Sequence, residues 1–222
     1  GPCSASCTST ASLPCRWRVP CRRRPGIRWP GCPGALEPGQ VQAMLASCDP
    51  ATATGRRDRA VLLLLSRMGL RAGEVAGLGL DDIDWRRGEI TVRGKGRRRD
   101  RLPLPADVGT AIVACLRDGR PASALDRTVF IAAQAPREAL SYTGITTIVA
   151  EAAARAGIPG PVHAHRLRHS AATAMLRGGG SLTEIGQALR HARPATTAIY
   201  AKVDAGALRP LGRPWPGQEE TA

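Results

Sequence analysis

The pattern of apolar and polar positions predicts a mainly helical chain. Apolar residues recur at helical spacing in residues 38–45, which begin with a proline, as suits the first turn of a short helix. Residues 56–68 predict a second helix, and its AVLLLLSRMG sequence is apolar nearly all round, so we expect this helix at the centre of the core. Gly69 ends that helix, and residues 71–78 predict another short one.

One part of the chain follows the alternation of a strand instead. Ile90 and Val92 alternate with polar residues, and two glycines flank Lys95 in a turn sequence, GKG. The following RRRDRLPL continues as a second strand, so the two predict an antiparallel hairpin with Lys95 at its tip. Residues 128–132, TVFIA, predict a further strand.

The rest of the pattern is helical and sets the fold class. Further helices are predicted over residues 105–116, 141–156, 164–177, 181–190 and 194–202. The chain is therefore expected to be α+β, mainly α-helical with a small antiparallel β-sheet.

Composition separates the two ends of the chain from its middle. Residues 1–33 hold six arginines and no acidic residue, are rich in Cys and Pro, and predict a disordered basic arm or a segment not selected to fold. Residues 34–205 carry the periodic pattern and predict one folded domain. Residues 206–222 predict a Pro-rich C-terminal tail.

Charge adds a class of partner to this picture. Lys and Arg number 32 against 18 Asp and Glu, a net charge of +14, which favours a polyanion such as DNA. An arginine-rich coding bias would also produce such an excess. Apolar runs such as residues 61–65 are far short of the ~20 residues that a membrane helix requires. No signal peptide is visible, so we expect a cytoplasmic protein that makes no contact with the membrane.

The seven cysteines carry no metal or disulfide signature. Five of them lie in the first 32 residues, and no two form a C-x-x-C pair. Nothing else indicates an oxidising compartment, so we interpret them as free thiols.

Three of the four histidines lie in one stretch, HAHRLRH, residues 163–169. On a helix at ~100° per residue, one face presents His165, Arg168, His169 and Ala172, and the opposite, packing face presents Leu167, Ala171, Ala174 and Met175. Three interpretations are open: an H-x-H-x3-H metal site, histidines with a structural role, or an oxyanion site. In the last, a guanidinium fork and an imidazole would bind phosphate oxygens.

Further motifs decide between these interpretations. Arg71 stands in MGLRAGEVAGL with Glu74 one turn later, and Tyr200 follows His191 by nine residues in LRHARPATTAIYAKV. Together the motifs resemble the catalytic domain of the tyrosine recombinase (phage integrase) family, over roughly residues 36–216. The family's set of Arg, Lys, His-x-x-Arg, His or Trp, and Tyr corresponds here to Arg71, Lys95, His165, Arg168, His191 and Tyr200.

The resemblance implies a DNA strand-transferase with chemistry like that of type IB topoisomerases, and neither metal nor cofactor. Arg71 and Arg168 would clamp the phosphate, and Tyr200 would attack it to form a 3′-phosphotyrosyl link. His165 would accept the proton of Tyr200, and Lys95 would protonate the departing 5′-oxygen. His191 would add a hydrogen bond, and Glu74 would buttress Arg71. We expect DNA contacts from Arg93, Arg97, Arg98, Arg99 and Arg166.

The resemblance also implies partners and a setting. It implies double-stranded DNA as partner, and a homo-oligomer, a tetramer, on that DNA, with the protein monomeric when free. We expect it to act in DNA recombination or integration, as a mobile-element protein associated with the nucleoid.

Two features depart from the family pattern. The family's separate N-terminal core-binding domain is not recognisable in residues 1–33, so we expect a truncated copy or a variant made of the catalytic domain alone. Arg190 stands where the family usually has glycine in Leu-Gly-His. If that position has positive φ, arginine costs about 1 kcal/mol there, and Arg190→Gly is expected to raise cleavage or stability.

A different class of function stays open at this stage. Residues 164–177, a glycine turn and residues 181–190 also fit a helix-turn-helix, with Ser181 and Glu184 as a capping box. The chain would then be a DNA-binding regulator without catalysis, or an inactive recombinase remnant. Tyr200 separates the alternatives, because a regulator has no use for a nucleophile.

Overall fold

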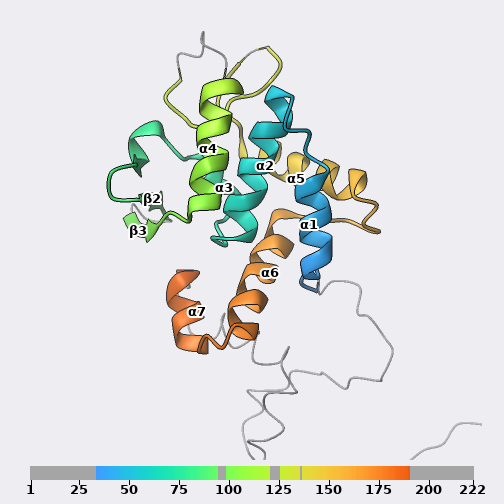
Figure 1. Cartoon of the computed structure of the whole chain (residues 1–222), viewed down its shortest axis with the longest axis vertical. Coiled ribbons are helices and arrows are strands. Elements are labelled where there is room, and N and C mark those ends of the chain that lie inside the picture. The colour runs from blue at the N-terminus through green and yellow to red at the C-terminus, as the bar shows by residue number, and fades with distance from the viewer. Residues whose placement is uncertain (1–33, 95–98, 121–125, 136, 191–222) are drawn as a thin grey trace, which may run out of the picture. The chain divides into compact units, whose positions relative to one another are not determined.

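The computed structural model describes residues 34–94, 99–120, 126–135 and 137–190 (Figure 1). Along the chain the elements are α1 (Pro38–Ala46), α2 (Ala53–Ser66), α3 (Ala72–Ala76), the 3-10 helix η1 (Leu80–Asp82), β1 (Ile83–Asp84), β2 (Glu89–Arg93), β3 (Arg99–Pro103), α4 (Ala106–Asp118), α5 (Tyr142–Arg155), α6 (Ala164–Arg177) and α7 (Leu182–Ala188). This agrees with the expected class of a mainly helical α+β chain. The predicted helix at 194–202, the arm at 1–33 and the tail at 206–222 lie outside the described residues.

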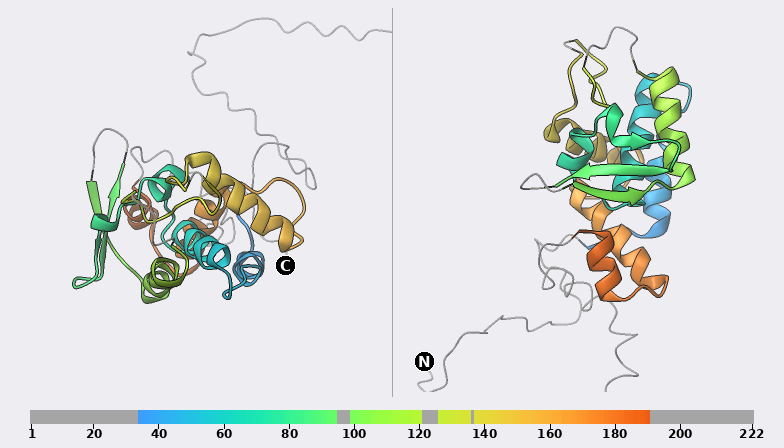
Figure 2. Two further views of the ribbon diagram at one scale, coloured as in Figure 1. Left: turned by 90° about the horizontal axis from the view of Figure 1, so that it is seen from above. Right: turned by 90° about the vertical axis from the view of Figure 1, so that its left-hand side faces the viewer.

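Helix α2 is the centre of the core, as the apolar sequence of its second half predicts. It contacts α1, α3, α4, α5 and α6, and it lies between α1 and α4 in Figures 1 and 2. Every residue from 60 to 66 is buried. The Thr52 side chain caps the helix by accepting a hydrogen bond of 3.0 Å from the Gly55 amide, so α2 begins three residues earlier than predicted.

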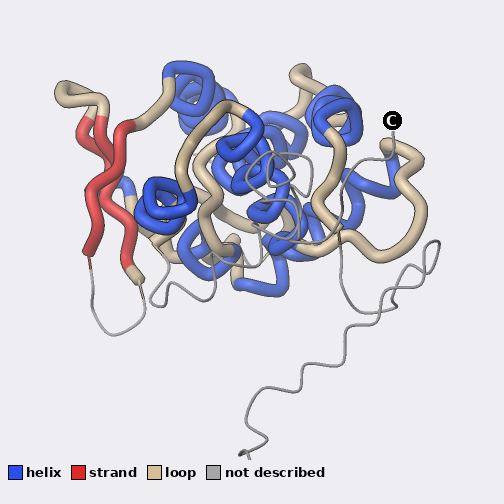
Figure 3. The backbone as a smooth tube through the Cα atoms, turned by 90° about the horizontal axis from the view of Figure 1, so that it is seen from below, coloured by secondary structure: helices blue, strands red, loops and turns tan. Residues whose placement is uncertain are grey.

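The three strands form one antiparallel sheet in the order β1-β2-β3, at one edge of the helices (Figure 3). Ile90 pairs with Leu102 and Val92 with Asp100, and the buried Ile90 and Val92 face the core, which confirms the predicted hairpin. The prediction missed β1, because two residues are too few to show an alternation.

The predicted strand at 128–132 is wrong. In the described residues this segment forms only isolated bridges, Gly79 with Thr128 and Ile131 with Ala139. The segment is apolar because its middle residues are buried in the core, and a short apolar run is compatible with any buried segment.

Helix α6 has the predicted bounds, but its packing differs from the prediction. Arg168 and Ala172 are buried, although they were expected on the face that presents its side chains, and Ala174 is exposed, although it was expected to pack. The difference arises because α7 covers α6 from the side of Ala172, where a small apolar cluster separate from the main core joins Ala172, Ile185 and Leu189. The predicted capping box at the start of α7 is confirmed.

Candidate active site

The structure describes part of the predicted site. Arg71, Glu74, His165 and Arg168 lie within the described residues, as do the candidate DNA contacts Arg93, Arg99 and Arg166. The other predicted residues, Lys95, Arg97, Arg98, His191 and Tyr200, lie outside them.

Arg71 is held by Glu74 at the start of α3. Oε2 of Glu74 accepts a hydrogen bond of 2.8 Å from the Arg71 amide, and Oε1 lies 2.7 Å from Nη1 of the Arg71 side chain. The Glu74 side chain is only 5% exposed, whereas that of Arg71 is 47% exposed. One buried carboxylate therefore caps the helix and orients a guanidinium group that still faces solvent.

Arg168 lies within reach of the same loop from α6. Its buried guanidinium donates from Nη1 to the carbonyl oxygen of Gly69, two residues before Arg71, and from Nη2 to the carbonyl oxygen of Leu189. Gly69 has φ +61°, and a Cβ atom there would collide with the Leu189 side chain. The loop before Arg71, helix α6 and the end of α7 thus meet at one junction.

His165 lies in a row of imidazole rings along α6. Its ring stacks on that of His163 with centroids 5.8 Å apart, and meets the ring of His169 edge-on at 6.0 Å. Partial burial, followed by the charges of His163 and Arg166, lowers the pKa of His165 below its usual value. This shift favours the neutral form of the imidazole, which is the form that can accept a proton.

His169, to which we assign a structural rather than a catalytic role, is more buried than His165. Burial lowers its pKa, and the charges of His165 and Arg168 lower it further. In the described residues no three His, Cys, Asp or Glu side chains are grouped in a way that could hold a metal ion.

Arg190, which follows α7, has the positive φ on which the predicted strain at this position depends. Its φ is 55°, and among the described residues no other non-glycine residue has positive φ. Its guanidinium Nη2 lies 2.6 Å from Oε2 of Glu74, and its Nε lies 3.9 Å from Asp100. This contact with Glu74 was not predicted, because it joins residues 116 positions apart. The signal available in the sequence was a charged residue in a position that usually belongs to glycine.

The candidate DNA contacts have partners within the protein. Arg93 donates two hydrogen bonds to Asp82, of 2.9 and 3.2 Å. In the strand register it lies opposite the exposed Arg99 of β3. Arg166 donates to the carbonyl oxygens of Gly34 and Pro161. Their role on DNA stays a prediction.

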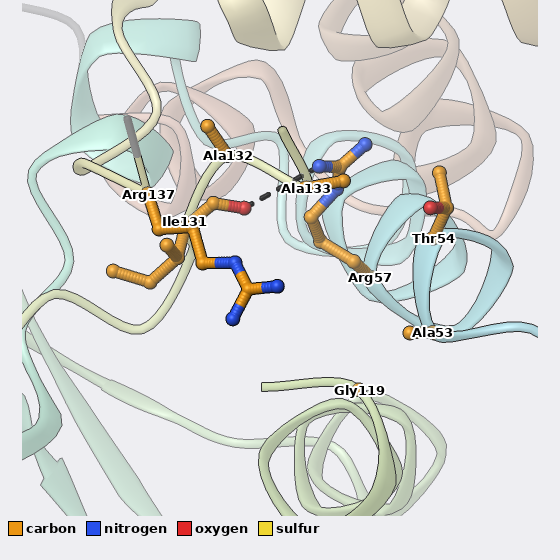
Figure 4. Close-up of a pocket in the computed structure, with 8 residues that line it drawn as sticks. All are labelled: Ala53, Thr54, Arg57, Gly119, Ile131, Ala132, Ala133 and Arg137. Carbon is orange, nitrogen blue, oxygen red and sulfur yellow. Dashed lines mark hydrogen bonds between the residues drawn. The ribbon is translucent and has the colours of Figure 1, made fainter. Parts of the chain in front are cut away.

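A pocket at the N-terminal end of α2 is separate from these residues. Figure 4 shows Arg57 and Arg137 at its rim, with Thr54 and Gly119 among the other lining residues. Arg57 is already held by Asp58 and by the carbonyl oxygen of Ile131. Because α2 has 14 residues at ~1.5 Å each, about 20 Å separates this end of the helix from the loop that leads to Arg71.

Comparison with known proteins matches this geometry to one family. A model of the phage integrase family matches residues 35–206. The chain is 49% identical over 190 residues to y4rA of Sinorhizobium fredii, which is named an integrase/recombinase, covering 85% of this chain and 46% of that protein. It is 38% identical over 170 residues to the tyrosine recombinase XerD of Mycobacterium tuberculosis, covering 75% of this chain and 53% of XerD.

Solved structures share the fold. The crystal structure of XerA recombinase superposes with a TM-score of 0.69 at 26% identity, over 80% of this chain and 63% of XerA. XerH site-specific recombinase, in a post-cleavage complex with palindromic difH substrate, gives a TM-score of 0.69 at 24% identity, over 81% of this chain and 52% of XerH.

These findings identify the class of the protein. The helices packed around α2 and the small sheet at one edge form a tyrosine recombinase catalytic domain. The chain belongs to the phage integrase family. It spans about half the length of y4rA and XerD. No helix in the described residues is long and apolar enough to cross a membrane.

Proposed function

We propose that this chain cleaves and rejoins DNA strands through a covalent 3′-phosphotyrosyl link at Tyr200. The hydrogen bond from Arg168 to the Gly69 carbonyl supports this most directly. It joins Arg168 to the loop that leads to Arg71, which lies 97 positions earlier in the sequence.

Arg71 and Arg168 would bind the non-bridging oxygens of the scissile phosphate. Negative charge grows on these oxygens as phosphorus becomes pentacovalent, and guanidinium groups fixed in advance stabilise it. Glu74 would keep Arg71 aimed at the phosphate. Arg168 would bring its guanidinium to the phosphate from α6, beside the loop that leads to Arg71.

The remaining predicted residues would move protons. The Tyr200 hydroxyl would pass its proton to His165 as its oxygen bonds to phosphorus, and the bond from phosphorus to the 5′-oxygen would break. Lys95 would protonate that 5′-oxygen, and His191 would donate a hydrogen bond to the phosphate. A 5′-hydroxyl from a second strand reverses the steps, which releases Tyr200 and rejoins the DNA.

The partner in this proposal is double-stranded DNA. XerH is described as bound to its DNA substrate, and the net charge of +14 on this chain suits the same kind of partner. We place Arg93, Arg97, Arg98, Arg99 and Arg166 on the DNA backbone. The same proposal includes a tetramer on DNA and association with the nucleoid. It also includes the division of the chain into an N-terminal arm (1–33), a catalytic domain (34–205) and a C-terminal tail (206–222).

A nicked duplex library with randomised flanking sequence tests the proposal without knowledge of the target site. Cleavage next to the nick releases a short fragment that diffuses away, so the protein stays linked to DNA on a denaturing gel. The chain has only two tyrosines, and the other, Tyr142, is 63% exposed on α5 and serves as a matched control. We expect Tyr142→Phe to retain the link and Tyr200→Phe to abolish it.

The helix-turn-helix alternative makes the opposite prediction. It is favoured by the capped start of α7 directly after α6 and its glycine turn. A regulator or an inactive remnant would shift DNA on a native gel and leave no linked DNA after denaturation.

A further inference from the structure

Arg190 occupies a position that is unfavourable for stability in three respects. Its backbone has φ 55°, which costs a residue with a Cβ atom about 1–2 kcal/mol. Its side chain is 5% exposed, so a full charge is removed from water. Its Nη1 atom is buried without a hydrogen-bond partner in the described part of the chain. Strain retained in this way commonly marks a function.

The contacts of Arg190 point to the residues that orient Arg71. Oε2 of Glu74 receives both the Arg71 amide at 2.8 Å and Nη2 of Arg190 at 2.6 Å. Oε1 of the same carboxylate receives Nη1 of Arg71 at 2.7 Å. A single buried carboxylate thus accepts hydrogen bonds from two guanidinium groups, that of Arg190 on Oε2 and that of Arg71 on Oε1.

The position of Arg190 in the chain gives this contact a second consequence. Arg190 directly follows Leu189, whose carbonyl oxygen accepts a hydrogen bond from Arg168. Helix α7 packs on α6 through a small cluster of its own, outside the main core. The Arg190–Glu74 ion pair therefore links the end of α7 to the carboxylate that orients Arg71. The same end of α7 carries the Leu189 carbonyl that Arg168 binds.

Charge explains why an arginine is useful at this point. A carboxylate beside Arg71 opposes the binding of a phosphodiester, because it is a negative charge next to a negative ligand. A second guanidinium on that carboxylate offsets its charge, while Asp100 is a weaker neighbour at 3.9 Å. Burial lowers the pKa of Arg190, and Glu74 and Asp100 oppose that effect.

We infer that Arg190 is a positioning residue for Arg71, acting through Glu74 to fix the guanidinium and leave its positive charge available to the scissile phosphate. This rests on the proposed function, because it assigns Arg190 to the same reaction. It also assigns the family-atypical arginine a use, whereas the sequence alone indicated only strain.

The test uses the full 222-residue chain and a DNA duplex selected by Tyr200-dependent capture. The rate of the covalent link is measured in a single turnover at saturating DNA, and DNA affinity is measured separately. We expect Arg190→Gly and Arg190→Met to lower the rate about tenfold or more while affinity changes by less than about twofold. Arg190→Lys, which keeps the charge, is expected to recover part of the rate.

Three controls separate positioning from a purely structural role. Arg177→Met removes an exposed arginine paired with Glu37 and should leave the rate within about twofold of the original. In a Glu74→Gln background, Arg190→Met should have little further effect, because the two residues act as one unit. A substrate with a methylphosphonate at the scissile position carries less negative charge, so the defect of Arg190→Met should shrink on it.

The outcomes distinguish this inference from the proposed function. If the original chain forms the Tyr200 link and Arg190→Met reacts at the same rate, the positioning role is wrong and the proposed function stands. If Arg190→Gly reacts faster than the original chain, Arg190 contributes only strain. If the original chain forms no link on any duplex in the library, the proposed function fails and this inference fails with it.

Discussion

The guanidinium group of Arg168 donates a hydrogen bond to the carbonyl oxygen of Gly69. Gly69 belongs to the loop that leads from α2 to Arg71, and Arg168 lies on α6. The Arg168 side chain, which we predict to bind phosphate, thus also connects α6 to the loop before Arg71. Arg168 should therefore affect stability as well as activity, unlike a residue that serves only the substrate.

Replacing Arg168 should destabilise the protein. Arg168→Ala leaves the carbonyl oxygens of Gly69 and Leu189 without this donor, and an unsatisfied buried acceptor costs about 1–3 kcal/mol. We expect urea unfolding to show a loss of at least about 2 kcal/mol. Arg67→Ala, which breaks an exposed pair with Asp107, should cost no more than about 1 kcal/mol. Equal losses in the free energy of unfolding of the two variants would contradict a role of Arg168 in connecting α6 to the loop before Arg71.

Gly69 should not tolerate a side chain. Gly69→Ala places a Cβ atom against Leu189 at a backbone φ of +61°, so we expect a loss of more than about 2 kcal/mol in the free energy of unfolding. Gly73 provides the matched control, because it lies in α3 with ordinary φ and no atom within 4 Å of a Cβ. Gly73→Ala should be neutral or stabilising by up to about 1 kcal/mol. An unchanged free energy of unfolding in Gly69→Ala would show that the loop before Arg71 does not pack closely against the end of α7.

The pH dependence of cleavage should reflect the lowered pKa of His165. A proton acceptor fails once it is protonated, so a lowered pKa moves the loss of rate to more acidic pH. We expect the acid limb of covalent-link formation to lie below pH 6.5, the ordinary value for histidine. Because the charge of His163 contributes to the shift, His163→Gln should move the limb back toward pH 6.5. A limb above pH 6.5 in the original chain would contradict the assignment of His165 as base.

Cys115 should resist alkylation in the folded protein. Burial raises the pKa of its thiol to about 11, which leaves almost no reactive thiolate at pH 8. We expect iodoacetamide to label Cys115 and the buried Cys48 only after unfolding, as measured site by site by mass spectrometry. Rapid labelling of Cys115 in native protein would show that α4 packs less tightly than the structure indicates.

Local patterns in the sequence were sufficient to predict most helices. Helix α6 begins and ends where periodicity places it, and α2 is central because its second half is apolar on every side. The segment 128–132 was misjudged because burial without strand pairing leaves the same apolar signature. The packing of α6 was misjudged because a helical wheel does not show where α7 will lie.

The candidate site was predictable only in part. Arg71 and Glu74 are three positions apart, so their pairing follows from helix geometry. The ion pair of Glu74 with Arg190 and the hydrogen bonds of Arg168 join distant segments, and tertiary packing alone brings them together. The family pattern indicated a positive φ at Arg190 only as a condition for strain, and it gave no indication of the ion pair with Glu74.

The most direct measurement is the identity of the residue that becomes linked to DNA. Tryptic digestion and nuclease treatment of the captured complex should leave a nucleotide attached to one peptide, which mass spectrometry can assign. The account predicts a 3′-phosphonucleotide on the peptide that contains Tyr200, with no modified Tyr142. A linked nucleotide on any other residue, or unmodified Tyr200 in protein that cuts DNA, would contradict it.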